Sequence, residues 1–192
     1  MTAGRPSPAL VGGVAVLERA LAYALGGLAF VTPDVLGRPT PCAAWDLRDL
    51  LAHLHDSMAA LQDGAETGRV SFVAVPAGDD VVSRVRDRAA RLLGAWANAD
   101  GNTLVWVHGQ PMTAPLMATA GAIEVTIHGW DVAVACGLHR PIPDDLADEL
   151  LDLSAVLIRD SDRPGRFGPP VPVPADAAPG DRLLAFLGRS PS

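Results

Sequence analysis

Three side chains of one short segment, Glu124, His128 and Asp131, have the types and the spacing needed for a metal site. Residues three or four positions apart lie on the same face of an α-helix, and Glu and His are common ligands of divalent metals. Apolar residues recur beside them at the spacing of a buried stripe, namely Ile123, Ile127, Trp130 and Val134. The spacing predicts either a metal site beside the seam of a helical bundle or an ordinary Glu–His surface pair, worth roughly 0.2–0.5 kcal/mol.

A metal site built on Glu124 and His128 needs a third ligand, and an earlier helical segment offers two histidines, His53 and His55. They are two positions apart, so on a helix they point in nearly opposite directions. Neither lies at the centre of the apolar stripe of its segment, and each could equally be a partly exposed histidine. Helical geometry alone does not choose between them.

Two stretches of the chain resemble the signatures of one family. Thr40–Leu54 (TPCAAWDLRDLLAHL) is similar to the Thr-Pro-Cys, Trp and Asp-Leu-Leu-x-His-Leu signature of the mycothiol-dependent maleylpyruvate isomerase N-terminal domain, one of the DinB-like metal-binding bundles. Glu124–Gly137 resembles its second signature, Glu-x3-His-Gly-Trp-Asp followed by small residues and Gly. The segments Phe167–Pro174 and Asp181–Arg189 further resemble a single-domain actinobacterial branch of the family.

The resemblance implies a fold, a set of ligands and a cosubstrate. The fold is an all-α, DinB-like antiparallel four-helix bundle, and the divalent-metal ligands carried over are His53, Glu124 and His128. Two imidazoles and one carboxylate suit zinc and leave a coordination position open, although nickel, iron or manganese could bind similar ligands. Mycothiol would bind through its sulfur and attack an electrophilic substrate. Asp131 has no ligand role by transfer, and its spacing predicts that it supports a ligand from behind.

The leading hypothesis is therefore a thiol-dependent transferase or isomerase in which the metal activates mycothiol. The family's isomerase completes its substrate site with an additional C-terminal domain, so maleylpyruvate isomerisation itself is not expected for this chain. A noncatalytic metal-binding or ligand-sensing module is the alternative, and a metal-dependent hydrolase with Asp131 or another, unassigned acid as base is a third. No residue is assigned a catalytic or thiol-binding role. His108 is the best distant candidate, and an exposed turn residue is its simpler interpretation.

Periodicity and helix-breaking residues predict the elements that would position these side chains. The predicted helices cover Leu10–Phe30, Asp46–Leu61, a segment that begins at Asp79 or Asp80 and ends at Trp96, and then Ala114–Cys136, Asp144–Asp160 and Asp181–Leu187. A small hairpin is expected after Thr103, with Gly109 and Gln110 at its tip, and Gln62–Gly78 is expected to be a loop. A Pro-rich C-terminal arm should follow the bundle. We expect one domain over residues 1–192, with a core at about 8–160 and the arm and short last helix at 161–192.

Composition restricts the partners. The 192 residues are 49% hydrophobic and carry a formal net charge of −7, which is typical of a folded globular protein and argues against binding to nucleic acid or an anionic membrane. No apolar run is expected to span a bilayer, and the N-terminus lacks the pattern of a signal peptide, so a cytoplasmic location is predicted. The two cysteines, Cys42 and Cys136, form no CxxC pair. A small-molecule thiol and an electrophile remain as the expected partners.

Overall fold

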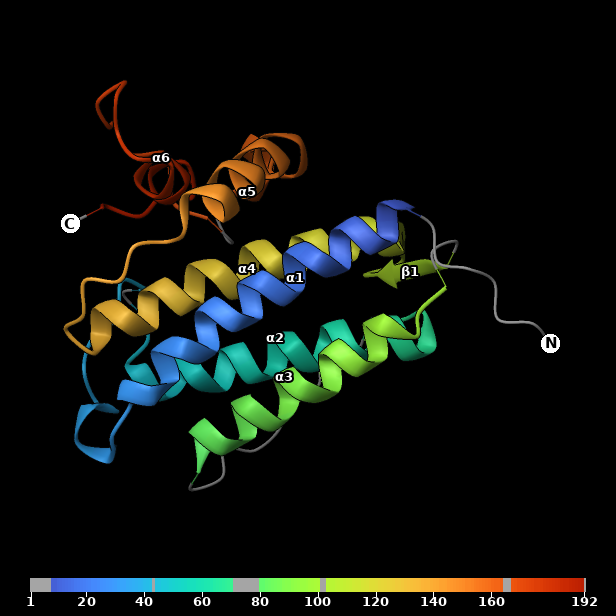
Figure 1. Cartoon of the computed structure of the whole chain (residues 1–192), viewed down its shortest axis with the longest axis horizontal. Coiled ribbons are helices and arrows are strands. Elements are labelled where there is room, and N and C mark those ends of the chain that lie inside the picture. The colour runs from blue at the N-terminus through green and yellow to red at the C-terminus, as the bar shows by residue number, and fades with distance from the viewer. Residues whose placement is uncertain (1–7, 43, 71–79, 101–102, 164–166, 192) are drawn as a thin grey trace. The chain divides into compact units, whose positions relative to one another are not determined.

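The computed structural model describes residues 8–42, 44–70, 80–100, 103–163 and 167–191. The chain divides into two compact units, residues 1–138 and 139–192. The first unit holds the predicted bundle, which is mostly helical with one small antiparallel sheet (Figure 1). The predicted fold class is thus confirmed. A single domain over the whole chain stays a prediction.

Helix α4 (Ala114–Ala135) is the central helix of the first unit. It is buried on nearly all sides, as expected of a helix whose composition is apolar all round. Helix α1 (Pro8–Gly27) packs along it in the same direction, since Gly13 lies against Pro115 and Ala118, and Ala24 lies against Gly129. A 3₁₀ turn, Leu28–Phe30, completes the helix that was predicted to end at Phe30.

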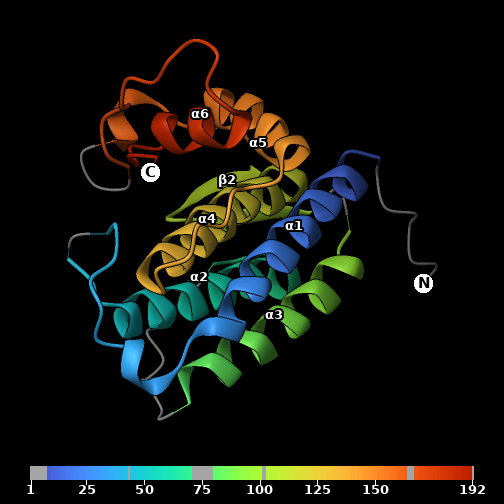
Figure 2. The same cartoon turned by 60° about the vertical axis from the view of Figure 1, so that its left-hand side comes forward.

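Helices α2 (Leu47–Thr67) and α3 (Val81–Ala97) form the other pair and run opposite to α1 and α4, as Figures 1 and 2 show. Asp46 caps α2 as predicted, because its carboxylate accepts the Asp49 backbone N–H at 2.9 Å. The predicted end at Leu61 was wrong. The helix continues for almost two more turns, to Gly68 in the left-handed conformation, while positions 71–79 of the predicted loop lie outside the described residues.

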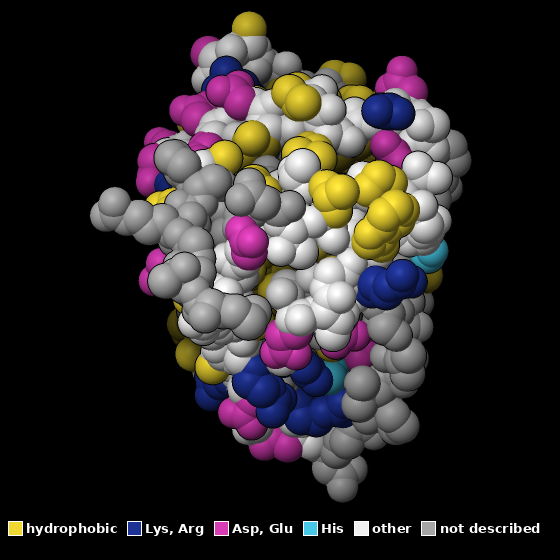
Figure 3. Space-filling view, turned by 90° about the vertical axis from the view of Figure 1, so that its right-hand side faces the viewer, with side chains coloured by type: hydrophobic (Ala, Val, Ile, Leu, Met, Phe, Trp, Pro, Cys, Tyr) yellow, Lys and Arg dark blue, Asp and Glu magenta, His cyan; other side chains and the backbone are white. Residues whose placement is uncertain are grey.

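The predicted hairpin is present and joins the ends of α2, α3 and α4. Strand β1 (Leu104–Val107) pairs antiparallel with β2 (Gln110–Thr113), with Val107 opposite Gln110. The tip is therefore His108–Gly109, one position earlier than predicted, and both residues have positive φ. Figure 3 looks onto this end, where Leu104 and Trp106 are among the exposed apolar residues.

The second unit consists of α5 (Asp144–Leu157), α6 (Pro179–Phe186) and the segments around them. Helix α5 packs on α6 through its apolar face, and the predicted Pro-rich arm is tied to α6 by the bond from the Val171 N–H to the Ala185 carbonyl, at 2.9 Å. Helix α5 ends three residues earlier than predicted.

Helix α1 also bears on the expected absence of a membrane span. By length and composition Val11–Phe30 could cross a bilayer, contrary to the expectation from the sequence. Half of this stretch is buried inside the protein, and the core helix of a folded bundle meets the same criteria. The segment is thus weak evidence for a membrane span.

Candidate metal centre

Of the three side chains of the Glu124–Asp131 segment, His128 and Asp131 lie on the inner part of α4 and Glu124 is partly accessible. His128 is 6% exposed and Asp131 is fully buried, which excludes the ordinary surface pair as an explanation for their spacing. His128 Nε2 lies 3.3 Å from Glu124 Oε1 one turn earlier. The Glu124 carboxylate keeps 29% of its surface accessible, so this side of the group is open to solvent.

Helix α2 contributes His53. Its Nε2 lies 2.8 Å from the same Glu124 oxygen, and its ring meets the His128 ring edge-on with centroids 5.0 Å apart. The indole of Trp45, which lies just before the α2 cap, has its ring centroid 4.4 Å from that of His53 and 6.2 Å from that of His128. The start of α2 is fixed by its Asp46 cap, and this fixes the turn on which His53 faces α4.

His55 lies elsewhere in the same helix. It is 4% exposed, pairs with Asp56 at 3.0 Å and lies near the α3 arginines Arg84 and Arg88. Burial and these two positive charges lower its pKa, against the hydrogen bond to Asp56. The two histidines thus do point to different neighbours, and His53 is the one beside Glu124 and His128.

Ser57 is a site residue that sequence reasoning missed. Its hydroxyl lies 3.2 Å from Glu124 Oε1 and 3.3 Å from His53 Nε2, one turn after His53 on α2. Its position four residues after His53 could have indicated it, because residues four apart lie on the same face of a helix. The hydroxyl adds a polar group at the accessible side of the cluster.

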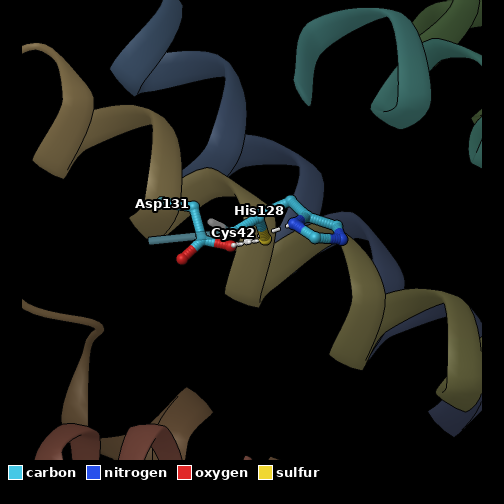
Figure 4. A group of neighbouring side chains, drawn as sticks. All are labelled: Cys42, His128 and Asp131. Atoms are coloured by element: carbon cyan, nitrogen blue, oxygen red, sulfur yellow. Dashed lines mark hydrogen bonds and ion pairs between the residues drawn. The ribbon is translucent and has the colours of Figure 1, made fainter. Parts of the chain in front are cut away.

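Behind His128, a second group of side chains meets Asp131. His128 Nδ1 lies 3.0 Å from Asp131 Oδ2, and the Cys42 thiol donates to the same oxygen at 3.4 Å (Figure 4). Asp131 therefore lies behind a histidine, as its spacing predicts. The contact from Cys42 could not be read from the sequence, because the two residues are 89 positions apart.

The side chains of the cluster strongly shift one another's pKa values. Burial alone would raise the pKa of Glu124, but the charge of His128 and hydrogen bonds from both histidines hold it well below its usual value. Burial would likewise lower the pKa of His128, whereas Glu124 and the hydrogen bonds to Asp131 and Cys42 raise it well above the ordinary value. Without a metal, a protonated His128 thus balances the charge of one of the two carboxylates that contact it.

The ligand atoms of His53, Glu124 and His128 lie within 4.8 Å of one another, and this geometry fits a metal ion. Ligands about 2.0–2.1 Å from a tetrahedral zinc are roughly 3.3 Å apart. The His128–Glu124 separation of 3.3 Å has that value, while the His53–Glu124 pair at 2.8 Å would open by about 0.5 Å. The residues present thus fit a three-ligand site with an open position.

His108, the distant candidate, lies at the exposed hairpin tip. With Arg69 and Trp106 it lines a surface cavity of about 320 Å³. It is not among the side chains grouped around Glu124, so the structure gives it no place in this cluster.

Comparison with known proteins identifies the family. The family described as "Mycothiol maleylpyruvate isomerase N-terminal domain" matches residues 17–133, which include all three grouped side chains. An uncharacterized protein of Mycobacterium tuberculosis is 30% identical, over 85% of this chain and 90% of its own length. A second one from the same organism is 33% identical, over 59% of this chain and 52% of its own length.

Solved structures agree on the fold. The crystal structure of the mycothiol-dependent maleylpyruvate isomerase superposes with a TM-score of 0.59 at 18% sequence identity, covering 74% of this chain and 67% of that one. A mutant of the same enzyme gives the same values. This likeness supports the bundle architecture, and the sequence match over most of the bundle gives the relationship: the chain belongs to the mycothiol maleylpyruvate isomerase N-terminal domain family.

Proposed function

We propose that His53, Glu124 and His128 hold a divalent metal, preferably zinc, and that the protein is a mycothiol-dependent transferase or isomerase. The observation that carries the proposal is the convergence of two imidazole nitrogens and one carboxylate oxygen from two helices, on a side of the bundle where Glu124 is partly accessible. A structural zinc more often has four protein ligands, whereas three leave a position for a small molecule.

The protein groups have separate tasks in this proposal. When bound, the metal would favour the thiolate form of a thiol at its open position. Asp131 accepts from His128 Nδ1, which turns Nε2 toward the ligand group and makes the imidazole a better donor. The Ser57 hydroxyl can hydrogen-bond a polar group at the accessible side, and the Trp45 ring packs against His53, which keeps 33% of its side chain accessible.

The choice of thiol rests on the family and on the named isomerase with the same fold. This chain covers 67% of that isomerase, so we do not extend its substrate to this chain. An electrophile small enough to reach the accessible side of Glu124 is the substrate class proposed. A noncatalytic metal-binding or small-ligand-sensing protein is the alternative, since of the two polar side chains described in contact with the ligands, Ser57 and Asp131, Asp131 is buried behind His128.

Metal content tests the site. We expect about one zinc per chain by elemental analysis in the parent and in His139→Ala, which removes an exposed histidine of the second unit. Zinc should be lost in His53→Ala and in His128→Ala. Undiminished zinc in His128→Ala would refute the ligand assignment.

Reaction with a thiol tests the function. The zinc-loaded protein is incubated with mycothiol and a panel of electrophiles, maleylpyruvate included, and adduct or isomer formation is followed by mass spectrometry. Chelation should abolish the reaction and zinc should restore it. Stoichiometric zinc without any zinc-dependent reaction across the panel would favour the noncatalytic alternative.

A further inference from the structure

The Asp131 carboxylate connects two parts of the chain that are distant in sequence. One oxygen, Oδ2, lies 3.0 Å from His128 Nδ1 on its own helix and 3.4 Å from the Cys42 sulfur (Figure 4). A carboxylate can only accept, so both neighbours act as donors. Because Asp131 is fully buried, these protein donors take the place of water.

Cys42 belongs to a loop that is closed by its own hydrogen bonds. The Thr40 hydroxyl donates to the Trp45 carbonyl at 2.9 Å and accepts the Cys42 N–H at 3.2 Å. The Trp45 N–H donates to the Cys42 carbonyl at 2.8 Å. The thiol and the Trp45 indole are therefore presented by one compact turn, so a shift of one moves the other.

We propose that Cys42 is a positioning residue of the metal centre. Its thiol holds the Asp131 carboxylate toward His128 and fixes the Thr40–Trp45 turn against α4. This inference rests on the proposed function, in which His128 binds metal through Nε2. A single contact would then orient both imidazoles, His128 through Asp131 and His53 through the Trp45 ring at 4.4 Å.

The same three groups could instead hold a metal themselves, since Cys42, His128 and Asp131 place their ligand atoms within 4.8 Å of one another. Such an ion would need His128 Nδ1 and would remove the N–H that Asp131 accepts. Nε2 faces Glu124 at 3.3 Å in either case, so the cobalt spectrum described below is what separates the two assignments. Without such an ion, Asp131 Oδ2 accepts from both the Cys42 thiol and His128 Nδ1, which gives each of these two donors a partner.

The test compares Cys42→Ala, Cys42→Ser and the matched control Cys136→Ala, which removes the other cysteine at the end of α4. We expect Cys42→Ala to weaken zinc binding by about tenfold. In metal-free Cys42→Ala, the His128 Nδ1 proton should exchange with solvent faster than it does in the metal-free parent, as measured by NMR. Cys42→Ser, whose hydroxyl can donate to Asp131, should recover both properties in large part, and Cys136→Ala should match the parent.

A double-mutant cycle separates positioning from general packing. If Cys42 acts through Asp131, Cys42→Ala should add little to the loss in zinc affinity already caused by Asp131→Asn. Full additivity, or parent-like affinity and proton exchange in Cys42→Ala, would overturn the proposal. So would a thiolate-to-metal charge-transfer band in the cobalt-loaded parent that disappears in Cys42→Ser, because that band would make Cys42 a ligand.

Proton exchange measured in the metal-free protein distinguishes failure of the Cys42 proposal from failure of the proposed function. A parent that binds no metal refutes the proposed function. Faster exchange of the His128 Nδ1 proton in metal-free Cys42→Ala would still support the contact through Asp131, and unchanged exchange would refute it. If Cys42→Ala does not fold, Cys42→Val, which is close to cysteine in size and has no group that can donate to Asp131, takes its place in this comparison.

Discussion

Replacing Gly129 by alanine should force α1 and α4 apart next to the metal centre. Gly129 lies between His128 and Trp130, where α4 lies close to Ala24 of α1. A Cβ at this position would lie 2.9 Å from both the Cα and the Cβ of Ala24. Carbon atoms in contact are about 3.5–4.0 Å apart, so the methyl group would overlap α1 by about 0.6–1.1 Å.

The expected cost follows from two opposing effects. Overpacking costs roughly 1–3 kcal/mol, and the upper half of that range applies because the Ala24 Cα is backbone and cannot rotate away. Alanine gains about 1 kcal/mol over glycine within a helix. We therefore expect Gly129→Ala to lower the free energy of unfolding by about 1–2 kcal/mol.

Gly94→Ala is the matched control, because a Cβ on this α3 residue would meet nothing within 4 Å. The same substitution should raise the free energy of unfolding there by about 0.5–1 kcal/mol. Urea unfolding followed by tryptophan fluorescence in a chelating buffer measures both, since the four tryptophans all lie in the first unit. A Gly129→Ala protein as stable as the parent, beside a stabilised Gly94→Ala, would refute the close approach of α1 to α4.

Three further results are expected. Zinc at a free concentration of 100 times its Kd should raise the free energy of unfolding of the parent by about 2.7 kcal/mol, and a similar gain in His128→Ala would contradict the site. Raising the pH should strengthen zinc binding, measured by competition with a chelator, because the raised pKa of His128 means that its proton competes with the metal until the pH passes that value. In the metal-free protein, higher pH should instead lower stability. The Glu124–His128 pair contributes its full stabilisation below the ordinary histidine pKa and loses it as the pH rises through the raised pKa of His128. A urea midpoint that rises over this pH range in the parent, but not in His128→Ala, would count against the pair. Asp46→Ala should lower the free energy of unfolding by about 0.5–2 kcal/mol through loss of the α2 cap, while Asp87→Ala on the exposed face of α3 should change it little, and equal losses would argue against a specific cap.

Much of the fold could be predicted from the sequence because its signals are local. The apolar spacing and the capping residue Asp46 indicate α2, and Gly137 marks the end of α4. The end of α2 was predicted too early because the apolar pattern weakens after Leu61, although packing still buries Gly64 against Val105 of the hairpin. The directions of the four helices depend on contacts between them, which no local pattern contains.

The candidate site divides in the same way. By itself the sequence determined that Glu124, His128 and Asp131 share one helical face, because the helical repeat alone requires it. It left His53 and His55 equivalent in geometry, and only the family resemblance favoured His53. Tertiary structure decided which histidine meets Glu124, how deeply Asp131 is buried and that Cys42 reaches it. These contacts join residues 71 and 89 positions apart, so they exist only once α2, α4 and the loop before α2 have packed together.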